Sequence, residues 1–277
     1  MRVGRMGHAE EALELLLSKD MKQATQRAKN IIQYNKERQL QEKIIYEEAI
    51  KQIEKINIED KNSIVLGGDN WHHGVVGIVS SKITDLYYKP SILICFENGD
   101  VGKGSGRSIP GFDIYEALTK CKDSLDAFGG HSMAVGLSVK KENLPKLKEE
   151  FENLSKKAEI KEKHPIINIE SILNIDKINK EIVESLNALQ PLGEGNKMPI
   201  FAFKNLKIDS IRSLTEGKHL KLTLKSNNNT YVNAIGFNFG HLADEFVIGD
   251  KVDVAGSLEI NTFNGVDSIQ INIQDIM

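Results

Sequence analysis

The stretch from residue 9 to residue 56 contains neither glycine nor proline, and this restricts how the first part of the chain can fold. It is rich in Glu, Lys, Gln and Leu, which favour helix, and its apolar residues recur at helical spacing, as at Leu13 and Leu16. Ser18-Lys19-Asp20 predicts one break or bend, because Asp is a good N-cap for a second helical part. We therefore expect residues 1–58 to form a long connecting helix with one solvated face.

Short apolar runs and helical patterns alternate between Asn62 and Lys157. Strands are expected over residues 63–66, 91–96, 101–108 and 134–139, and helices over residues 74–88, 113–125 and 143–157. This alternation predicts an α/β domain at residues 59–160, with a mixed sheet flanked by helices. Its glycine turns would lie at strand ends, where open sheets bind their ligands.

A polar and highly charged stretch at residues 156–163 predicts the boundary to a second domain, at residues 164–277. A β-rich run is expected at residues 166–175, a helix at 177–189, strands at 200–214, 219–225, 230–239, 251–261 and 268–273, and a short helix at 241–246. Five strands with a helix between the third and fourth are the chain order of an all-β OB barrel, although another small five-stranded barrel or sandwich would share much of the pattern.

Composition limits the class of protein. The 277 residues are 40% hydrophobic, which is enough to bury a core in each of two domains. Cys95 and Cys121 are the only cysteines, too few for a disulfide framework. Without a leader or an apolar stretch of membrane-spanning length, we expect a cytoplasmic protein with no membrane partner. The net charge of −3 does not indicate a polyanion partner, so DNA binding would need a local basic surface.

Two segments predict a phosphate-binding pocket: residues 103–108, which include Ser105 and Arg107, and residues 127–136, which include Gly129-Gly130-His131. Adjacent glycines expose backbone N–H groups, while Arg107, Ser105 and His131 supply a guanidinium, a hydroxyl and an imidazole, all of which can donate to a phosphate oxygen. For the Gly-Gly-His triplet alone, a tight turn before a strand is the alternative, and for Arg107 a surface ion pair.

A third segment, residues 69–79 with Trp71-His72-His73-Gly74, precedes these two, and all three follow in the order and approximate spacing of one domain of a known family. The chain resembles the RecJ family of single-strand-specific exonucleases, in its DHH-associated domain and the OB domain that follows. The segment Gly4-Arg5-Met6-Gly7-His8-Ala9-Glu10 is similar to the end of the family's catalytic domain, where a Gly-Arg pair precedes the connecting helix.

The resemblance implies the hydrolysis of single-stranded DNA from 5′ to 3′ in DNA repair and recombination. It implies that Ser105, Arg107 and Gly129-Gly130-His131 hold the 5′-terminal phosphate or the backbone of the DNA, opposite a two-metal catalytic site. Arg5 is a further candidate for DNA binding. Single-stranded DNA is the expected partner, and a single-strand-binding protein is a second candidate.

The family's catalytic domain, with Asp and His ligands for Mn²⁺ or Mg²⁺, has no counterpart here, and no Asp-His-His triplet occurs in the sequence. We interpret the chain as a C-terminal portion whose catalytic DHH domain is missing or lies on a separate chain. Alone it is expected to bind DNA without cutting it, and to hold neither a catalytic residue nor a metal ion. Part of the apolar face of the connecting helix would then lack its partner, which favours self-association.

Asp69, His72 and His73 nevertheless offer ligands for manganese or zinc. Adjacent histidines point in different directions, and no Cys or Glu at ligand spacing completes a shell. In the domain that the chain resembles, the equivalent stretch, a Trp with a following His and Gly, positions the helix that begins at Gly74. We therefore interpret Trp71 and His72 as structural residues or as supports of the pocket.

Basic residues gather on the first two expected strands of the barrel, and aromatic rings follow on later ones. OB folds hold single strands with a basic groove and stacking rings, so we single out Lys218, Lys221 and Tyr231 as DNA-binding, with Phe263 as a second ring near a loop. The wider basic set is Lys204, Lys207, Arg212, Lys218, His219, Lys221 and Lys225. Its lysines could equally form an ordinary solvated face, and rings at alternating positions, such as Phe237 and Phe239, are expected in the core.

Two other functions remain open from the sequence. One is a stand-alone nucleic-acid-binding or adaptor module that presents single-stranded DNA or a replication protein. The other is half of a short-oligonucleotide or cyclic-dinucleotide phosphodiesterase, since such enzymes share the domain with the Gly-Gly-His triplet. Those relatives lack a C-terminal barrel, so the five-strand pattern favours the exonuclease family.

Overall fold

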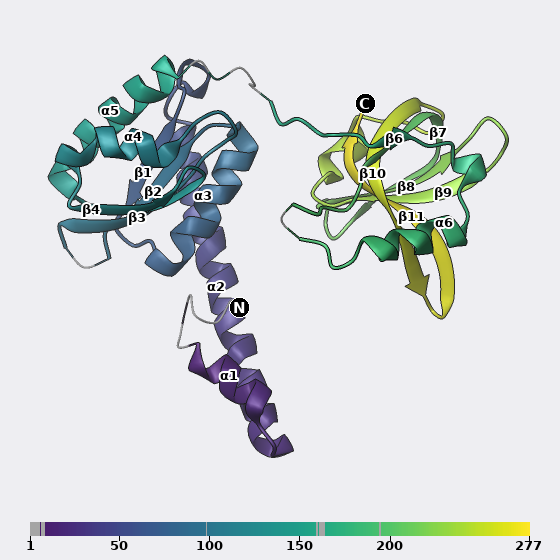
Figure 1. The fold of residues 1–277 in the computed structure, drawn as a ribbon, viewed down its shortest axis with the longest axis horizontal. Coiled ribbons are helices and arrows are strands. Elements are labelled where there is room, and N and C mark those ends of the chain that lie inside the picture. The colour runs from purple at the N-terminus through teal and green to yellow at the C-terminus, as the bar shows by residue number, and fades with distance from the viewer. Residues whose placement is uncertain (1–5, 7–8, 98, 159, 161–163, 194) are drawn as a thin grey trace. The chain divides into compact units, whose positions relative to one another are not determined.

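The computed structural model describes the chain except residues 1–5, 7–8, 98, 159, 161–163 and 194. The chain divides into two compact units, Met1–Pro165 and Ile166–Met277 (Figure 1). Each unit buries hydrophobic residues of its own, so each has the core that an independent domain requires.

Two helices begin the first unit, α1 (Glu10–Leu17) and α2 (Met21–Ile53). The break near Ser18-Lys19-Asp20 is confirmed, and the Asp20 side chain caps α2 by accepting a hydrogen bond from the Lys22 amide. The last turns of α2 contribute three buried side chains to a core: Ile45, Ala49 and Ile53. Neither α2 nor any other described helix is both long enough and apolar enough to cross a membrane.

A five-stranded sheet lies at the centre of this unit, in the order β1-β2-β3-β5-β4. Its strands are β1 (Ile64–Gly68), β2 (Ser91–Cys95), β3 (Val101–Arg107), β4 (Ala127–His131) and β5 (Ala134–Lys140). β1 and β2 are parallel and the other neighbours are antiparallel, so the sheet is mixed, as predicted.

Helices cover both faces of the sheet because successive side chains of its strands point to opposite sides. Ile64 and Leu66 of β1 join a cluster with α2 and α3 (His73–Tyr87). Val65, between them, joins a second cluster with α4 (Ile114–Lys120) and α5 (Leu144–Lys157) (Figure 1). The three helices expected in this domain are confirmed, although α4 is followed by a separate 3₁₀ turn, η3 (Lys122–Ser124).

Gly129-Gly130-His131 lies inside edge strand β4, paired with β5, so the expectation of a glycine turn at a strand end was wrong. The turn of this hairpin is formed by Ser132 and Met133. Gly130 has a φ of +145°, and a Cβ atom there would lie 2.3 Å from the carbonyl oxygen of Ala134. Only glycine fits so close an approach, which explains why this strand has the composition of a loop.

The second unit is a closed barrel of five strands: β7 (Phe201–Leu214), β8 (His219–Lys225), β9 (Tyr231–Gly236), β10 (Lys251–Phe263) and β11 (Val266–Ile276). The strands follow the order β10-β11-β9-β8-β7, and β10 also pairs with β7, which closes the barrel. A short 3₁₀ helix, η7 (Gly240–Asp244), lies between the third and fourth strands, as the OB order predicts.

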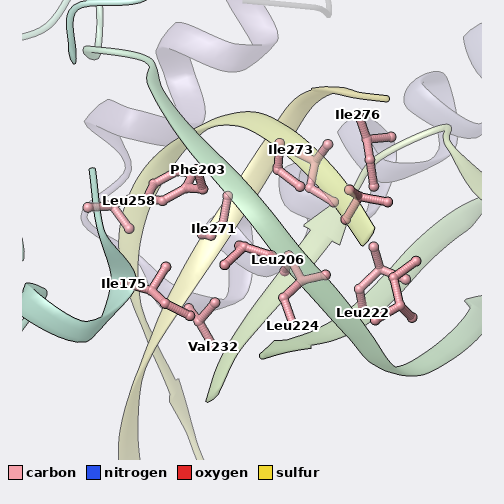
Figure 2. Close-up of a cluster of buried hydrophobic side chains, with 14 of the residues drawn as sticks. Ile175, Phe203, Leu206, Leu222, Leu224, Val232, Leu258, Ile271, Ile273 and Ile276 are labelled. Atoms are coloured by element: carbon pink, nitrogen blue, oxygen red, sulfur yellow. The ribbon is translucent and has the colours of Figure 1, made fainter. Parts of the chain in front are cut away.

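Side chains from several strands fill the barrel, and Figure 2 shows Phe203, Leu222 and Ile271 among them, all fully buried. Along β8, Leu220, Leu222 and Leu224 are buried, whereas Lys221 between the first two is exposed. One face of each strand therefore builds the core and the other remains available for contacts.

The segment before the barrel differs from prediction. The expected β-rich run contains only β6 (Ser171–Ile172), which pairs in parallel with β7, and a 3₁₀ turn, η5 (Ile175–Lys177), follows. The expected helix starts later and is divided into α6 (Lys180–Ser185) and η6 (Leu186–Leu189). Asn179 sets this start, because its side chain caps α6 by accepting a hydrogen bond from the Ile182 amide.

Candidate nucleic-acid interface

Strand β3 has glycine at every second position, and this alternation builds the candidate site. Cβ atoms at Gly102, Gly104 and Gly106 would lie 2.6, 2.9 and 2.7 Å from the nearest core side-chain atoms, which belong to Ile94 or Val135. The glycine face of β3 is therefore closed by the core. The residues between the glycines face the opposite side of the sheet: Lys103, Ser105 and Arg107.

Arg107 and Ser105 lie together on that side. Arg107 Nη1 donates hydrogen bonds to Ser105 Oγ at 2.9 Å and to the Gly106 carbonyl oxygen at 2.7 Å. Helix α3 approaches both residues closely, since a Cβ atom at Gly77 would lie 3.0 Å from Ser105 Oγ and 3.3 Å from Arg107 Nη2. The strand and the helix therefore hold this half-buried guanidinium in place.

Strand register places the other predicted pocket residues on the same face, because directly paired residues share a face of a sheet. Ser105 is aligned with Gly136 of β5 and, beyond it, Gly129 of β4. Arg107 is aligned in the same way with Ala134 and then His131. The backbones at Arg107 and His131 are thus two strand spacings, about 10 Å, apart.

The face formed by β3, β5 and β4 is open. Its other residues are small: Ala127, Gly129, Ala134, Gly136 and Ser138. A Cβ atom at Gly129 or Gly136 would meet nothing within 4 Å. A groove of about 370 Å³ lies here, with His73, Val76, Lys103 and Ser138 among its lining residues. Because β4 is the edge strand, one row of its backbone N–H and C=O groups also points away from the sheet.

Trp71 and His72 have the structural roles predicted for them. Trp71 is buried, and its Nε1 donates a hydrogen bond to Glu48 Oε2 on α2 at 2.7 Å. His72 is the N-cap of α3, with Nδ1 accepting a hydrogen bond from the Gly74 amide at 3.1 Å. Together they fix the start of the helix that packs against Arg107.

Glu97, which follows β2, is the site residue that sequence reasoning missed. It accepts hydrogen bonds from the His73 amide at 3.0 Å and from His73 Nδ1 at 2.8 Å. Burial alone would raise the pKa of Glu97, but the hydrogen bonds from His73 outweigh it and the pKa is lowered. A separation of 24 residues links the two, so no local spacing could have revealed the pair.

Candidate ligand atoms of His72, His73 and Glu97 lie within 4.8 Å of one another. This grouping resembles a metal site, but His72 Nδ1 already caps α3, and the Glu97 carboxylate already accepts two hydrogen bonds from His73. A metal-bound histidine normally uses one ring nitrogen for the metal and donates from the other, and His72 instead accepts at Nδ1. The geometry favours an oriented His73 over a bound ion.

On the barrel, strand register aligns three lysines and one tyrosine, each directly paired with the next across β10, β7, β8 and β9. We call this set the lysine row: Lys251, Lys207, Lys225 and Tyr231. Like charges placed opposite each other destabilise a sheet, so this arrangement has a cost in the absence of an anion. Lys225 Nζ lies 5.1 Å from the centre of the Tyr231 ring, and a hydrogen bond with Tyr231 raises the pKa of Lys225. Arg212 and Lys221 form a second directly paired set of cations.

The remaining predicted residues are spread over the barrel surface. Lys218 lies in the turn before β8, and Tyr231 and Phe263 are 52% and 71% exposed. The expectation that Phe237 is a core residue was wrong: β9 ends at Gly236, and the Phe237 ring is 50% exposed, 5.3 Å from that of His219. Phe239 packs against the core, as predicted. Arg5 lies outside the described residues.

Comparisons with known proteins identify both domains. Residues 60–157 match the model of the DHHA1 domain, and residues 169–275 match that of the RecJ OB domain. The single-stranded-DNA-specific exonucleases RecJ of Bacillus subtilis and Haemophilus influenzae are 34% and 31% identical to the chain, over 99% of its length in both cases. The chain spans only 35% and 49% of the length of these two relatives.

Among solved structures, RecJ from Thermus thermophilus in complex with Mn²⁺ is similar to the whole chain, with a TM-score of 0.82 and 28% sequence identity. The match covers 100% of this chain and 39% of that one. Both domain matches, the relatives and the fold agree. The chain therefore belongs to the RecJ family and represents its C-terminal region, a DHHA1 domain followed by a RecJ OB domain.

Proposed function

We propose that this chain is the DNA-guiding part of an exonuclease that hydrolyses single-stranded DNA from 5′ to 3′ in DNA repair and recombination. Arg107, Ser105 and His131, with the backbone at Gly129 and Gly130, would anchor the 5′-terminal phosphate or the adjoining backbone. The observation that carries the proposal is the alternation along β3, which places a guanidinium and a hydroxyl on a face where small residues leave room for a phosphate.

The barrel would hold the strand beyond the anchored end. The lysine row offers three ammonium groups in register, and Lys218 and Lys221 add two further cations elsewhere on the barrel surface. Tyr231 and Phe263 expose rings on which bases can stack. Binding in this manner follows the backbone and needs no particular base sequence.

Hydrolysis itself would belong to a catalytic DHH domain of the complete protein, since the relatives are much longer than this chain. Mn²⁺ or Mg²⁺ would be held by that domain, because the grouping of His72, His73 and Glu97 among the described residues loses His72, whose Nδ1 caps α3 instead of donating as the second nitrogen of a metal-bound histidine does. Leu16 and Leu17 on α1, 73% and 68% exposed, would contact it. The OB domain supports this function over that of a phosphodiesterase half.

Binding of a 5′-phosphorylated single-stranded oligonucleotide at low salt tests the anchor, with the unphosphorylated strand and a duplex as comparisons. We expect the chain to prefer the phosphorylated strand, and Arg107→Ala to weaken its binding about tenfold or more, because hydrogen bonds to charged groups are strong. Arg27→Ala, which removes a cation from α2, should leave the preference intact.

Equal binding of phosphorylated and unphosphorylated strands, by the chain and by Arg107→Ala alike, would refute the anchor. Binding that depends on the lysine row alone would instead favour the stand-alone adaptor, whose only DNA site is the barrel.

A further inference from the structure

We infer that the groove at Lys103 and Gly104, next to Ser105 on β3, is a pocket for the nucleoside that adjoins the anchored phosphate, with His73 as a positioned contact to it. This inference rests on the proposed function, because it takes a phosphate at Ser105 and Arg107 as its fixed point. Lys103 lines the groove and lies two residues from Ser105 on the same face of β3. Two residues of a strand span about 7 Å, a distance that one nucleoside can bridge.

The floor of the groove suits a flat ring. The open position at Gly136 and the small side chains of Ala127 and Ser138 leave much of the floor as backbone, and Val76 of α3 adds an apolar contact. The polar groups, on Lys103, Ser138 and His73, belong to different elements around it. A nucleobase presents apolar faces and polar edges, which matches this division between floor and rim.

His73 is held in one orientation by two hydrogen bonds to Glu97, one from its backbone amide and one from Nδ1. With Nδ1 donating to the carboxylate, Nε2 of the neutral ring is left as an acceptor. A fixed acceptor in the groove can receive a hydrogen bond from a donor on the base or the sugar. Glu97 is therefore a positioning residue, which acts on the nucleoside only through His73.

Two short ligands test this pocket: a 5′-phosphorylated trinucleotide, and the same trinucleotide without its first base. By calorimetry we expect the chain to bind the intact ligand about fivefold or more tightly, because contacts to a base face are lost in the other. Ser138→Leu, which fills the groove, should abolish this difference. Thr119→Leu, at an exposed position of α4 on the other side of the sheet, should preserve it.

Glu97→Gln should reduce the same difference while leaving the dependence on the 5′-phosphate unchanged. Trp71 is the only tryptophan and lies in this unit, so its fluorescence verifies that each variant is folded.

The outcomes separate this inference from the proposed function. Equal binding of both ligands by the unaltered chain, with both weakened by Arg107→Ala, would overturn the pocket and leave the anchor standing. A base-dependent difference that Ser138→Leu removes, in a chain whose affinity for both ligands is unchanged by Arg107→Ala, would overturn the anchor and with it the assignment of the groove to the nucleoside beside the anchored phosphate. A difference that survives Ser138→Leu would place the base elsewhere and overturn the pocket.

Photocrosslinking locates the base directly. A trinucleotide with 5-iododeoxyuridine at its first position should crosslink to the peptides that contain His73 or Phe128, which both line the groove. Crosslinks confined to residues 166–277 would contradict the inference.

Discussion

Gly129 and Gly130 are adjacent glycines, but the backbone conformation requires glycine at only one of the two positions. At Gly130 the φ of +145° and the 2.3 Å approach to Ala134 exclude a side chain, whereas a Cβ atom at Gly129 meets nothing within 4 Å. Gly130→Ala should therefore destabilise the first unit by about 2 kcal/mol or more, through strain and steric overlap. Urea unfolding followed by Trp71 fluorescence measures this change.

Gly129→Ala is the matched control for that substitution. It should shift the unfolding midpoint much less, since only backbone entropy and β propensity change there. Equal shifts for the two variants would show that the close approach at Gly130 is absent in solution.

Glu152 gives the first unit a dependence on pH. Burial would raise its pKa, but hydrogen bonds from Ser63 and Asn62 prevail and hold it below the ordinary value of 4.5. A carboxyl whose pKa is lowered by folding stabilises the folded state above its unfolded pKa, and this contribution is lost as pH falls through the folded pKa. The free energy of unfolding should therefore decrease as pH falls below 4.5.

Glu152→Gln should lower the stability at neutral pH and flatten its decline in acid. Glu149→Gln, at an exposed position of the same helix, should leave both unchanged. Denaturation curves at several pH values compare the variants, and parallel curves for all three proteins would exclude Glu152 as the source.

Single residues were predictable from the sequence where the chemistry is local. Arg107 and Ser105 are two positions apart in one strand, so their common face follows from its alternation. The capping role of Asp20 also depends only on nearby residues. Glu97 was missed because the fold, and not spacing along the chain, brings it to His73.

At the scale of elements, the lysine row depends on the register of four strands, because each of its members lies on a different strand. Each phosphate neutralised on a single strand changes the slope of log K against log salt by about 0.7. Lys207→Ala and Lys225→Ala should therefore each reduce this slope by about 0.7 for a single-stranded oligonucleotide longer than the anchor requires.

Lys43→Ala on α2 is the control, since Lys43 is also exposed but pairs with Glu47 in the other unit. Fluorescence anisotropy at several salt concentrations gives the slopes. Unchanged slopes in both row variants would assign the row to an ordinary solvated surface.

Most helices and strands could be predicted because their periodicity is long and regular, as in α2 and the barrel strands. Strand β4 could not, because its glycines, one of which permits a close backbone approach, also resemble those of a loop. The end of β9 was misjudged for a related reason: alternation continues to Phe237, whereas pairing stops at Gly236.

At the scale of the whole molecule, the two units have separate cores, and this predicts two unfolding transitions. Phe203 is fully buried in the barrel. Phe203→Ala should lower the stability of the barrel by about 3–5 kcal/mol, through lost burial and a cavity. Far-ultraviolet circular dichroism should show this change, while Trp71 fluorescence, which reports the first unit, should not.

A single transition that moves with Phe203→Ala in both signals would show instead that the units unfold together.

The seven residues of strand β3 meet two requirements at alternating positions: glycines that pack against the core, and polar side chains on the opposite face. The tolerance of β3 to substitution should therefore alternate from one position to the next. Substitutions at the even-numbered positions should destabilise the fold, whereas those at the odd-numbered positions should leave the fold intact and change ligand affinity. Insertion of one residue would exchange the two faces of the strand. Lys103, Ser105 and Arg107 would then point into the core, and the glycines would face the ligand. If β3 holds the proposed anchor, its affinity for DNA can change only by substitution within these seven residues, never by shifting the frame of the strand.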